Sequence, residues 1–254
     1  MSILQQEVAP RGVRKLQTSI ARSAAEIKEA QWLRWRVFAD EGGARLTSEE
    51  VGFDIDAFDA HCVHILVRDL TLDQVIGTYR VLTGAASLET GGFYSETEFD
   101  LDRLKHLRPR IAELGRSCVH PDYRTGAVIT LLWGAIADVV AANGCDILIG
   151  CASVSMSDGG HTAAALHARM MQHQAAPLEF RVAPRNPLNL TGLDPARAQP
   201  TPPLIKGYLR AGAWVCGAPH WDADFNTADF LMLLQVGALE ERYARRYAPP
   251  ARNC

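Results

Sequence analysis

Residues 111–130, IAELGRSCVHPDYRTGAVIT, decide the fold because they join a predicted strand to a predicted helix. The segment begins as a short strand in which Glu113 and Arg116 stand three positions apart, so ideal alternation places their side chains on opposite faces. A polar turn follows at residues 120–126. The apolar run at residues 127–142 then has the composition of a buried helix.

The turn at residues 120–126 is basic and contains a glycine, a composition that suits an anion site. The first backbone N–H groups of a helix have no partner within the helix, and the helix dipole favours negative charge at that end. With Glu113 on the same segment, the sequence suggests group transfer from a phosphate-bearing carrier. An ordinary buried strand–helix junction is the alternative that this segment alone leaves open.

The composition limits the class of protein and its surroundings. The chain has 254 residues, of which 48% are hydrophobic and 22% charged, enough for a substantial core. Its net charge of −3 gives no general attraction to nucleic acid, which we do not expect as a partner. Six scattered cysteines without a CxxC pair indicate reduced thiols. With no signal-peptide pattern and no apolar run of about 18 residues, we expect a cytoplasmic protein.

Hydrophobic periodicity predicts the order β-α-β-β-loop-β-α-β-α-β-β, an α/β fold built on one mixed sheet. Ser23 and Glu26 have the spacing of a capping box before the first helix. We expect a flexible arm at residues 1–12 and a single domain at residues 13–254. The expected strands are residues 14–22, 62–68, 74–82, 111–119, 145–152, 213–219 and 227–236, and the expected helices are residues 25–41, 127–142, 161–174, 202–212 and 238–247.

Charged residues that interrupt apolar segments are the candidate functional groups. Glu113 lies in an apolar strand, where a carboxylate is either paired structurally or kept for proton transfer, since burying it unpaired is costly. Arg80 and Arg116 are its natural partners. An acidic loop at residues 49–59 can hold an amine, tune a neighbouring pKa or simply face solvent. Its aspartates are Asp54, Asp56 and Asp59.

Neither the histidines nor the acidic loop has the spacing of metal ligands. His161, His167 and His173 cannot share one helical face, and the loop lacks the ligand count and glycine of a calcium loop. Cys118 fits a small buried residue better than a nucleophile. We therefore expect no metal site and no tightly bound cofactor.

Four short motifs resemble the signature of acyl-homoserine-lactone synthases, which use a GNAT-like fold to move an acyl chain onto an amino acid. These motifs are Leu33-Arg34-x3-Phe38, Asp54-x-Asp56-x2-Asp59, Gly77-x2-Arg80 and Glu113-x2-Arg116. Longer strings, spread from about residue 16 to residue 247, resemble the ornithine-lipid N-acyltransferases. They are FYSETEFD at 93–100, ELGRSCVHPDYR at 113–124, LLWGAIADVV at 131–140, PPLIKGYLRAGAWV at 202–215 and DADFNTADFLMLL at 222–234.

The resemblance implies a GNAT-like acyltransferase with a mixed central sheet flanked by helices. It implies transfer of a 3-hydroxyacyl chain from acyl-carrier protein to the α-amine of ornithine, giving lyso-ornithine lipid in the first step of ornithine-lipid synthesis. One departure concerns the donor: Ala127 and Ile129 stand where a coenzyme A loop usually has glycines. Fewer positions for close backbone approach favour the single phosphate of the acyl-phosphopantetheine on a carrier protein.

The resemblance also implies roles for residues near the chemistry. Glu113, directly or through a water, is the expected catalytic base, with Arg116 orienting it. A backbone carbonyl with a water could equally serve as the base. Backbone N–H groups near residues 118–120 are expected to stabilise the oxyanion.

The substrate and the donor are expected to bind on either side of this chemistry. Asp56 and Asp59 would hold the amine or the cationic side chain of the substrate. Arg80 would pair with those carboxylates or hold the substrate carboxylate. The expected contacts to phosphopantetheine are Val119, Arg124, Thr125, Gly126 and Ala127.

The expected partners are acyl-carrier protein and ornithine. Because a lyso-lipid must leave into a bilayer, we also expect peripheral contact with the inner face of the cytoplasmic membrane, for which the tail helix at residues 238–247 offers Arg242, Arg245 and Arg246. Simple packing or contact with the carrier protein are alternatives for this helix. Two other functions stay open: synthesis of another N-acyl amino acid or an acyl-homoserine lactone, and non-catalytic acyl-carrier or lipid binding.

Overall fold

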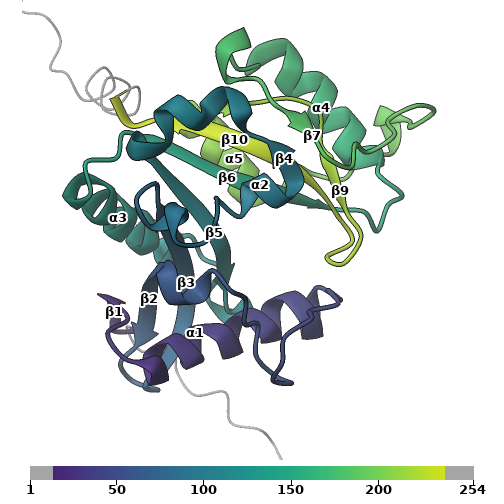
Figure 1. Ribbon diagram of the computed structural model, residues 1–254. Coiled ribbons are helices and arrows are strands. Elements are labelled where there is room, and N and C mark those ends of the chain that lie inside the picture. Colours follow the sequence, from purple (N-terminus) through teal and green to yellow (C-terminus); the bar gives the residue numbers. More distant parts are fainter. Residues whose placement is uncertain (1–13, 238–254) are drawn as a thin grey trace, which may run out of the picture.

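A mixed sheet runs through residues 14–237, the part of the chain that the computed structural model describes (Figure 1). Its strand order is β1-β2-β3-β5-β6-β10-β8, with β9 paired to β10. Neighbouring strands are antiparallel except β5 and β6, which are parallel. The strands are β1 Leu16–Ile20, β2 Val63–Asp69, β3 Gln74–Thr83, β5 Ile111–Val119, β6 Ile147–Ser155, β8 Trp214–Val215, β9 His220–Asp222 and β10 Thr227–Gln235, while β4 Phe99–Asp100 and β7 Ala183–Pro184 form a separate small sheet.

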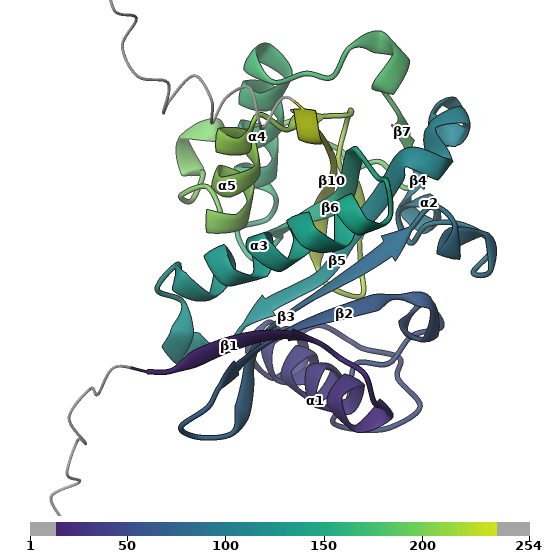
Figure 2. The same ribbon diagram turned by 90° about the vertical axis from the view of Figure 1, so that its left-hand side faces the viewer.

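Helices cover both faces of the large sheet, as Figure 2 shows. On one face, Leu33 of α1 packs in a core with Leu66 of β2. On the opposite face, Leu132 of α3 shares a core with Ile65 and Val67, the strand neighbours of Leu66. This alternation along β2 explains why a continuous apolar strand serves two cores. The helices are α1 Ala24–Trp35, α2 Ser95–Glu98, α3 Ala127–Ala142, α4 His161–His173 and α5 Pro203–Ala211.

Local capping explains where two of these helices begin and end. The Ser23 hydroxyl accepts a hydrogen bond from the backbone N–H of Glu26, whose carboxylate accepts one from the N–H of Ser23, so the predicted capping box is confirmed. After α1 the chain continues as a π-helical turn, Arg36–Glu41. The end of α5 at Gly212 is also confirmed, because this residue takes the left-handed conformation with φ of +99°.

The long connection between β3 and β5, predicted to be irregular, contains short regular elements. These are α2, β4 and the 3-10 helices Ala86–Leu88 and Asp102–Arg110. Its apolar side chains Phe93, Phe99 and Leu104 pack in a core with Ile111 of β5, and so cover a further part of the sheet. The predicted strand at 213–219 is shorter than expected, because only Trp214–Val215 forms a strand there, as β8, and β9 begins after it at His220.

The predicted arm at residues 1–12 lies outside the described residues. So does the predicted tail helix at 238–247, with Arg242, Arg245 and Arg246. The limits of the domain therefore stay predictions. Among residues 14–237, no helix combines the length and the apolar character needed to cross a membrane.

The parallel strands β5 and β6 stay together over only three residue pairs. Ile111–Glu113 pairs with Ile147–Ile149, after which β6 continues beside β10 alone to Ser155. Figure 1 shows the two strands diverging beyond this point. Gly150 marks the divergence, because a Cβ there would lie 2.4 Å from the carbonyl oxygen of Leu114. A strand pair that opens within the sheet gives a ligand access to its middle.

Candidate active site

The divergence of β5 and β6 opens a cavity of about 330 Å³. Side chains from both faces of the sheet line it. Glu113 and Arg116 come from the face that α1 covers, and Tyr79 and Tyr208 from the opposite face, where their hydroxyls are hydrogen-bonded to each other. A cavity that passes between two strands suits an extended substrate such as an acyl chain on a phosphopantetheine arm.

A β-bulge in β5 brings Glu113 and Arg116 to the same cavity. Arg80 of β3 is opposite Gly115, whereas Thr78, two residues earlier, is opposite Cys118, so β5 contains one extra residue. Arg116 takes a left-handed conformation with φ of +48° in this bulge. Because the extra residue reverses the alternation of side chains, the prediction that Glu113 and Arg116 face opposite sides is wrong.

Glu113 is buried and accepts three hydrogen bonds from the start of α2. The backbone N–H groups of Tyr94 and Ser95 each lie 2.7 Å from one of its oxygens, and the Ser95 hydroxyl donates as well. Burial raises the pKa of Glu113, against the opposing effect of these donors. The structure does not show the predicted contact by which Arg116 would orient Glu113: the backbone at the start of α2 holds Glu113, and Arg116 lies 3.2 Å from Asp54 and 3.3 Å from Asp56.

Asp59 is held in a buried network of arginines. Arg34 donates to both of its oxygens at 2.9 and 2.8 Å, Arg80 donates to Oδ1 at 2.8 Å and Gln31 to Oδ2 at 2.9 Å. Burial alone would raise the pKa of Asp59, but the hydrogen bonds and charges of the two arginines hold it well below its usual range. Both oxygens are thus engaged within the protein, so the structure does not support the predicted contact of Asp59 with the substrate amine. Asp59 fixes the acidic loop instead.

Asp56 is the most exposed carboxylate of this network, with 20% of its side chain accessible, and it pairs with the buried Arg80. The Asp56 Oδ1 atom accepts from Arg80 at 2.6 Å, while its Oδ2 atom lies 3.3 Å from Arg116 without a hydrogen bond. Of the two roles predicted for Arg80, the structure shows pairing with the aspartates. Arg80 also lines the cavity, beside the ring of Phe58.

The turn predicted to bind the donor lies between β5 and α3. Gly126, with φ of +89°, begins the helix, and Thr125, Gly126 and Ala127 are exposed. The guanidinium of Arg124 is held by a bidentate pair with Glu41 at 2.6 and 2.7 Å and donates to the carbonyl of Val119 at 3.0 Å. The structure thus brings the five predicted residues together at an exposed helix N-terminus.

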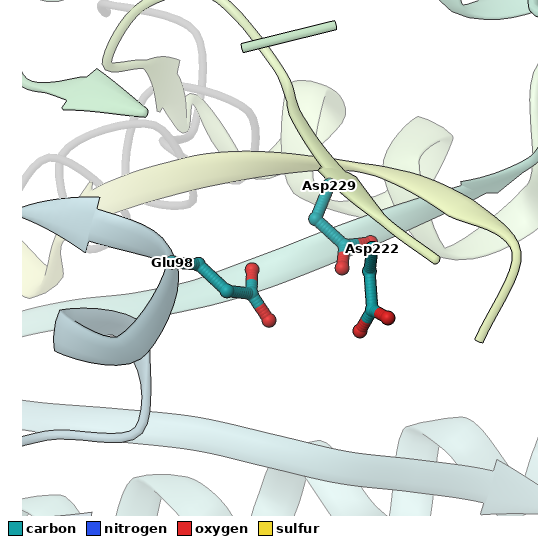
Figure 3. Close-up of side chains that lie close together, drawn as sticks. All are labelled: Glu98, Asp222 and Asp229. Atoms are coloured by element: carbon teal, nitrogen blue, oxygen red, sulfur yellow. The ribbon is translucent and has the colours of Figure 1, made fainter. Parts of the chain in front are cut away.

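A cluster of three carboxylates borders the same cavity. Glu98 ends α2, Asp222 ends β9 and Asp229 lies in β10, and Figure 3 shows their side chains converging. One oxygen from each lies within 4.8 Å of the others. Burial raises the pKa of Glu98 to about 8 and that of Asp229 to about 6, and the proximity of the other carboxylates adds to both effects.

The fold has clear relatives among known acyltransferases. A GNAT acetyltransferase domain model matches residues 33–134, which include β2, β3 and β5. The structure resembles FeeM, an N-acyl amino acid synthase from uncultured soil microbes, with a TM-score of 0.56 and 10% identity over 90% of this chain and 94% of that one. It also resembles the acyl-homoserine-lactone synthase LasI, with a TM-score of 0.52 and 16% identity over 88% of this chain and 91% of that one. The predicted GNAT-like fold is confirmed.

Sequence comparison gives the family. The L-ornithine N(alpha)-acyltransferase of Rhizobium meliloti is 37% identical over 94% of this chain and 86% of its own length. The enzyme of that name from Rhodobacter capsulatus is 36% identical over 90% of this chain and 93% of its own length. This chain belongs to the L-ornithine N(alpha)-acyltransferase family. It is therefore an N-acyltransferase enzyme, and the non-catalytic alternative is set aside.

Several site residues of this ornithine N-acyltransferase family member were not predicted from its sequence. Asp229 carried a usable signal, because a carboxylate directly before the apolar run FLMLL at 230–234 resembles Glu113 in its apolar strand. Glu41 and Glu98 lie in ordinary polar segments that give no such indication. Their proximity to Arg124 and to Asp229 depends on the tertiary structure.

Proposed function

We propose that this acyltransferase joins a 3-hydroxyacyl chain, delivered as a thioester on acyl-carrier protein, to the α-amine of ornithine. The product would be lyso-ornithine lipid, the first intermediate of ornithine-lipid synthesis. The observation that carries the proposal is the cavity between β5 and β6, which is lined by carboxylates on one side and opens within a GNAT-like sheet. The names of the relatives at 36–37% identity support ornithine as the acceptor.

The donor would approach from the end of β5. Its phosphopantetheine phosphate would bind near Val119 and Arg124, at the first N–H groups of α3, which have no partner within the helix. The arm and its acyl chain would then extend into the opening between β5 and β6. Ala127 and Ile129, in place of glycines, support a donor with one phosphate rather than the pyrophosphate of coenzyme A.

The reaction needs one deprotonation before attack. The α-ammonium loses a proton, the free amine attacks the thioester carbonyl, a C–N bond forms, the C–S bond breaks and the carrier thiol takes up a proton. Glu113 is the proposed base through a water. Its Oε1 atom accepts two hydrogen bonds and Oε2 only one, which leaves Oε2 with capacity to accept a further donor.

The oxyanion site proposed near residues 118–120 is better placed at the bulge. The N–H of His120 already donates to the carbonyl of Ile76 at 2.8 Å, and Cys118 pairs with Thr78 in the ladder. Arg116 and Ser117 have no partner residue in this ladder. Their N–H groups are therefore the better candidates for stabilising the oxyanion next to the cavity.

Release of the lipid product is proposed to involve peripheral contact of this cytoplasmic enzyme with the inner membrane face. The tail residues Arg242, Arg245 and Arg246 are basic and stand beside apolar residues in the sequence, as in interfacial helices. Binding of the enzyme to vesicles that contain anionic lipids, before and after removal of residues 238–254, tests this part. Unchanged binding would move the contact to another part of the chain.

Mass spectrometry of reaction products tests the main proposal. Purified enzyme is given 3-hydroxyacyl-carrier protein or the matching acyl-coenzyme A, with a panel of amino acids that includes ornithine, lysine, glutamine and glycine. We expect N-acylornithine as the main product and faster transfer from the carrier protein. Preference for another amino acid, or formation of an acyl-homoserine lactone from S-adenosylmethionine, would contradict ornithine as the acceptor. No transfer from either donor would contradict the proposal as a whole.

A further inference from the structure

We propose that Glu98, Asp222 and Asp229 bind the side-chain ammonium of the amino-acid substrate and so make the enzyme specific for a diamino acid. This inference rests on the proposed function, because it names how the acceptor is recognised. It assigns a ligand to the three carboxylates in Figure 3 that neither the acyl transfer nor the arginine network uses.

The two buried carboxylates of this cluster have neutral side chains as their hydrogen-bonding neighbours, Tyr94 and Cys151 beside Glu98 and Ser153 and Thr227 beside Asp229. Glu98 is 4% exposed and Asp229 is 3% exposed. Both oxygens of Glu98 and the Oδ1 atom of Asp229 are buried without a hydrogen bond of good geometry. Unpaired buried carboxylates are costly to the fold, so they are expected where a ligand completes them. All three carboxylates line the cavity, so a substrate in it can reach them.

Within the described part of the chain, the acidic loop has arginine partners that the Glu98 cluster lacks. Asp54, Asp56 and Asp59 are matched by the guanidinium groups of Arg34, Arg80 and Arg116. Among the ion pairs formed within residues 14–237, none includes a carboxylate of the Glu98 cluster. The protein thus supplies the cations for one acidic group and, in its described part, leaves the other open to a cation from outside.

The size and number of the acceptors suit an ammonium group. An ammonium has three N–H donors, and at charge-assisted N···O distances of about 2.8 Å tetrahedral directions place their acceptors about 4.6 Å apart. The three oxygens of the cluster lie within 4.8 Å of one another, with one offered by each residue. The cluster therefore provides one acceptor for each N–H of a side-chain ammonium.

The cluster and the reaction centre belong to the same cavity. Cys151 on β6 lies close enough to Glu98, Asp229 and Glu113 for all three charges to act on its thiol, and it donates to the Ser95 hydroxyl that holds Glu113. A short diamino acid can therefore place its side-chain ammonium at the cluster while its α-amine faces the β5 bulge. An amino acid without the second ammonium would leave the carboxylates unpaired, which disfavours its binding.

Binding of an ammonium should release protons. Burial raises the pKa of Glu98 to about 8 and that of Asp229 to about 6, so near pH 7 the empty cluster holds at least part of a proton. A bound cation stabilises the ionised carboxylates and displaces that proton. A metal ion would do the same, and the test must therefore distinguish a metal from an amine.

Calorimetry without the acyl donor tests binding separately from catalysis. Ornithine is titrated into the enzyme at pH 7 in buffers of different ionisation enthalpy, with norvaline, which has a hydrogen atom in place of the side-chain amine, as the matched ligand. We expect ornithine to bind with proton release and norvaline to bind at least about 30-fold more weakly. Equal affinities, or binding of ornithine without proton release, would overturn the inference.

Single substitutions test whether the carboxylates of the cluster bind the side-chain ammonium of ornithine. Glu98→Gln and Asp229→Asn should each weaken ornithine binding at least about 30-fold and leave norvaline binding nearly unchanged. Asp224→Asn, on the same hairpin but exposed and outside the cavity, is the control and should behave as wild type. If the two cluster variants lower kcat alone and leave ornithine binding intact, the cluster serves the chemistry and the inference fails.

Two further results keep this inference distinct from the proposed function. If Mg²⁺ or Ca²⁺ alone raises the Tm of wild type but not of Glu98→Gln, the cluster is a metal site and the inference is overturned. If ornithine binding depends on Glu98 as described but no acyl group is transferred, the inference stands and the proposed function fails. A circular-dichroism melt of each variant confirms that it is folded before binding is measured.

Discussion

Glu113 and Arg116 face the same cavity although they stand three positions apart in one strand. The bulge that makes this possible depends on a single arginine in a left-handed conformation. The two residues are not partners: Glu113 holds the backbone at the start of α2, and Arg116 pairs with the acidic loop. Each therefore connects a different segment to the strand that carries the proposed chemistry.

Replacing Glu113 by Gln should affect both catalysis and stability. As the proposed base, Glu113 should account for about 10²–10⁴-fold in kcat. The amide NH2 group would also face a backbone N–H of Tyr94 or Ser95, which should lower the free energy of unfolding by about 1–3 kcal/mol.

Steady-state kinetics across pH and urea unfolding measure the two effects of Glu113→Gln. For the wild type, kcat/KM should rise with pH through the pKa of the base, and this rise should disappear in the variant. If kcat falls by less than about tenfold and the pH profile keeps its shape, Glu113 only positions α2. Glu89→Gln, exposed on the same connection, is a suitable control.

Arg34 should be the most sensitive position of the arginine network. Its side chain is fully buried and donates to Asp54 and Asp59 at 2.8–2.9 Å, so Arg34→Met would leave two buried carboxylates short of a partner. We expect the free energy of unfolding to fall by about 3–5 kcal/mol, as measured by urea unfolding.

The matched control is Arg36→Met. Arg36 directly follows α1, and its replacement removes only an exposed ion pair with Asp40. This change should alter stability by no more than about 0.5 kcal/mol. Equal effects of the two substitutions would show that the buried network contributes little to the stability of the fold.

Gly150 should tolerate no side chain, because its position fixes where β5 and β6 diverge. In Gly150→Ala the new Cβ would lie 2.4 Å from the backbone oxygen of Leu114, so one strand must shift. We expect a loss of about 1–3 kcal/mol in stability and a raised KM for the acyl donor. Gly134→Ala, in an open position on α3, should instead stabilise by up to about 1 kcal/mol.

Thermal melts and donor titrations of the two glycine variants make this comparison. Loss of stability in both would indicate that any added side chain is harmful. The loss of stability in Gly150→Ala could then not be attributed to the divergence of β5 and β6.

Much of the fold could be predicted from sequence because it depends on local patterns. A few neighbouring residues are enough to predict the capping box at Ser23, the end of a helix at Gly212 and the apolar strand that contains Glu113. The bulge at Arg116 was not predicted, since ideal alternation is the default for a strand and the left-handed residue is an arginine, although Gly115 beside it is a possible sign of a bulge.

The site was predicted less well than the fold because its pairings are long-range. Asp59 was expected to bind substrate, but its full set of partners comes from α1 and β3, which a motif in the acidic loop does not reveal. The cluster of Glu98, Asp222 and Asp229 joins residues from two distant segments. Charge patterns along the chain identify candidate groups, whereas their partners decide which of them remain free for a ligand.

The turn before α3 provides a test of the donor. Arg124 is exposed and held by Glu41, so Arg124→Gln should change the fold little. If it helps bind the phosphate of the donor, the variant should raise KM for acyl-carrier protein about 10-fold and leave KM for ornithine unchanged. Arg197→Gln, in an exposed turn, is the control. Equal changes in the two KM values would contradict a donor site at this turn.

The Glu98 cluster should make the unliganded enzyme less stable as pH rises from about 5 to 8. Burial raises the pKa of Glu98 to about 8 and that of Asp229 to about 6, so in this range these two carboxylates bind more protons in the folded state than in the unfolded state, whereas the lowered pKa values of His64, His167 and His220 act in the opposite direction. By linkage, the free energy of unfolding decreases with pH wherever the folded state holds the extra protons. Glu98→Gln and Asp229→Asn remove titrating groups and should each flatten this dependence, as followed by Tm at pH 5.5 and 8.

Saturating ornithine should raise the Tm more at pH 8 than at pH 5.5, because it binds the ionised cluster. An equal rise at both values would show that ornithine binds without these carboxylates.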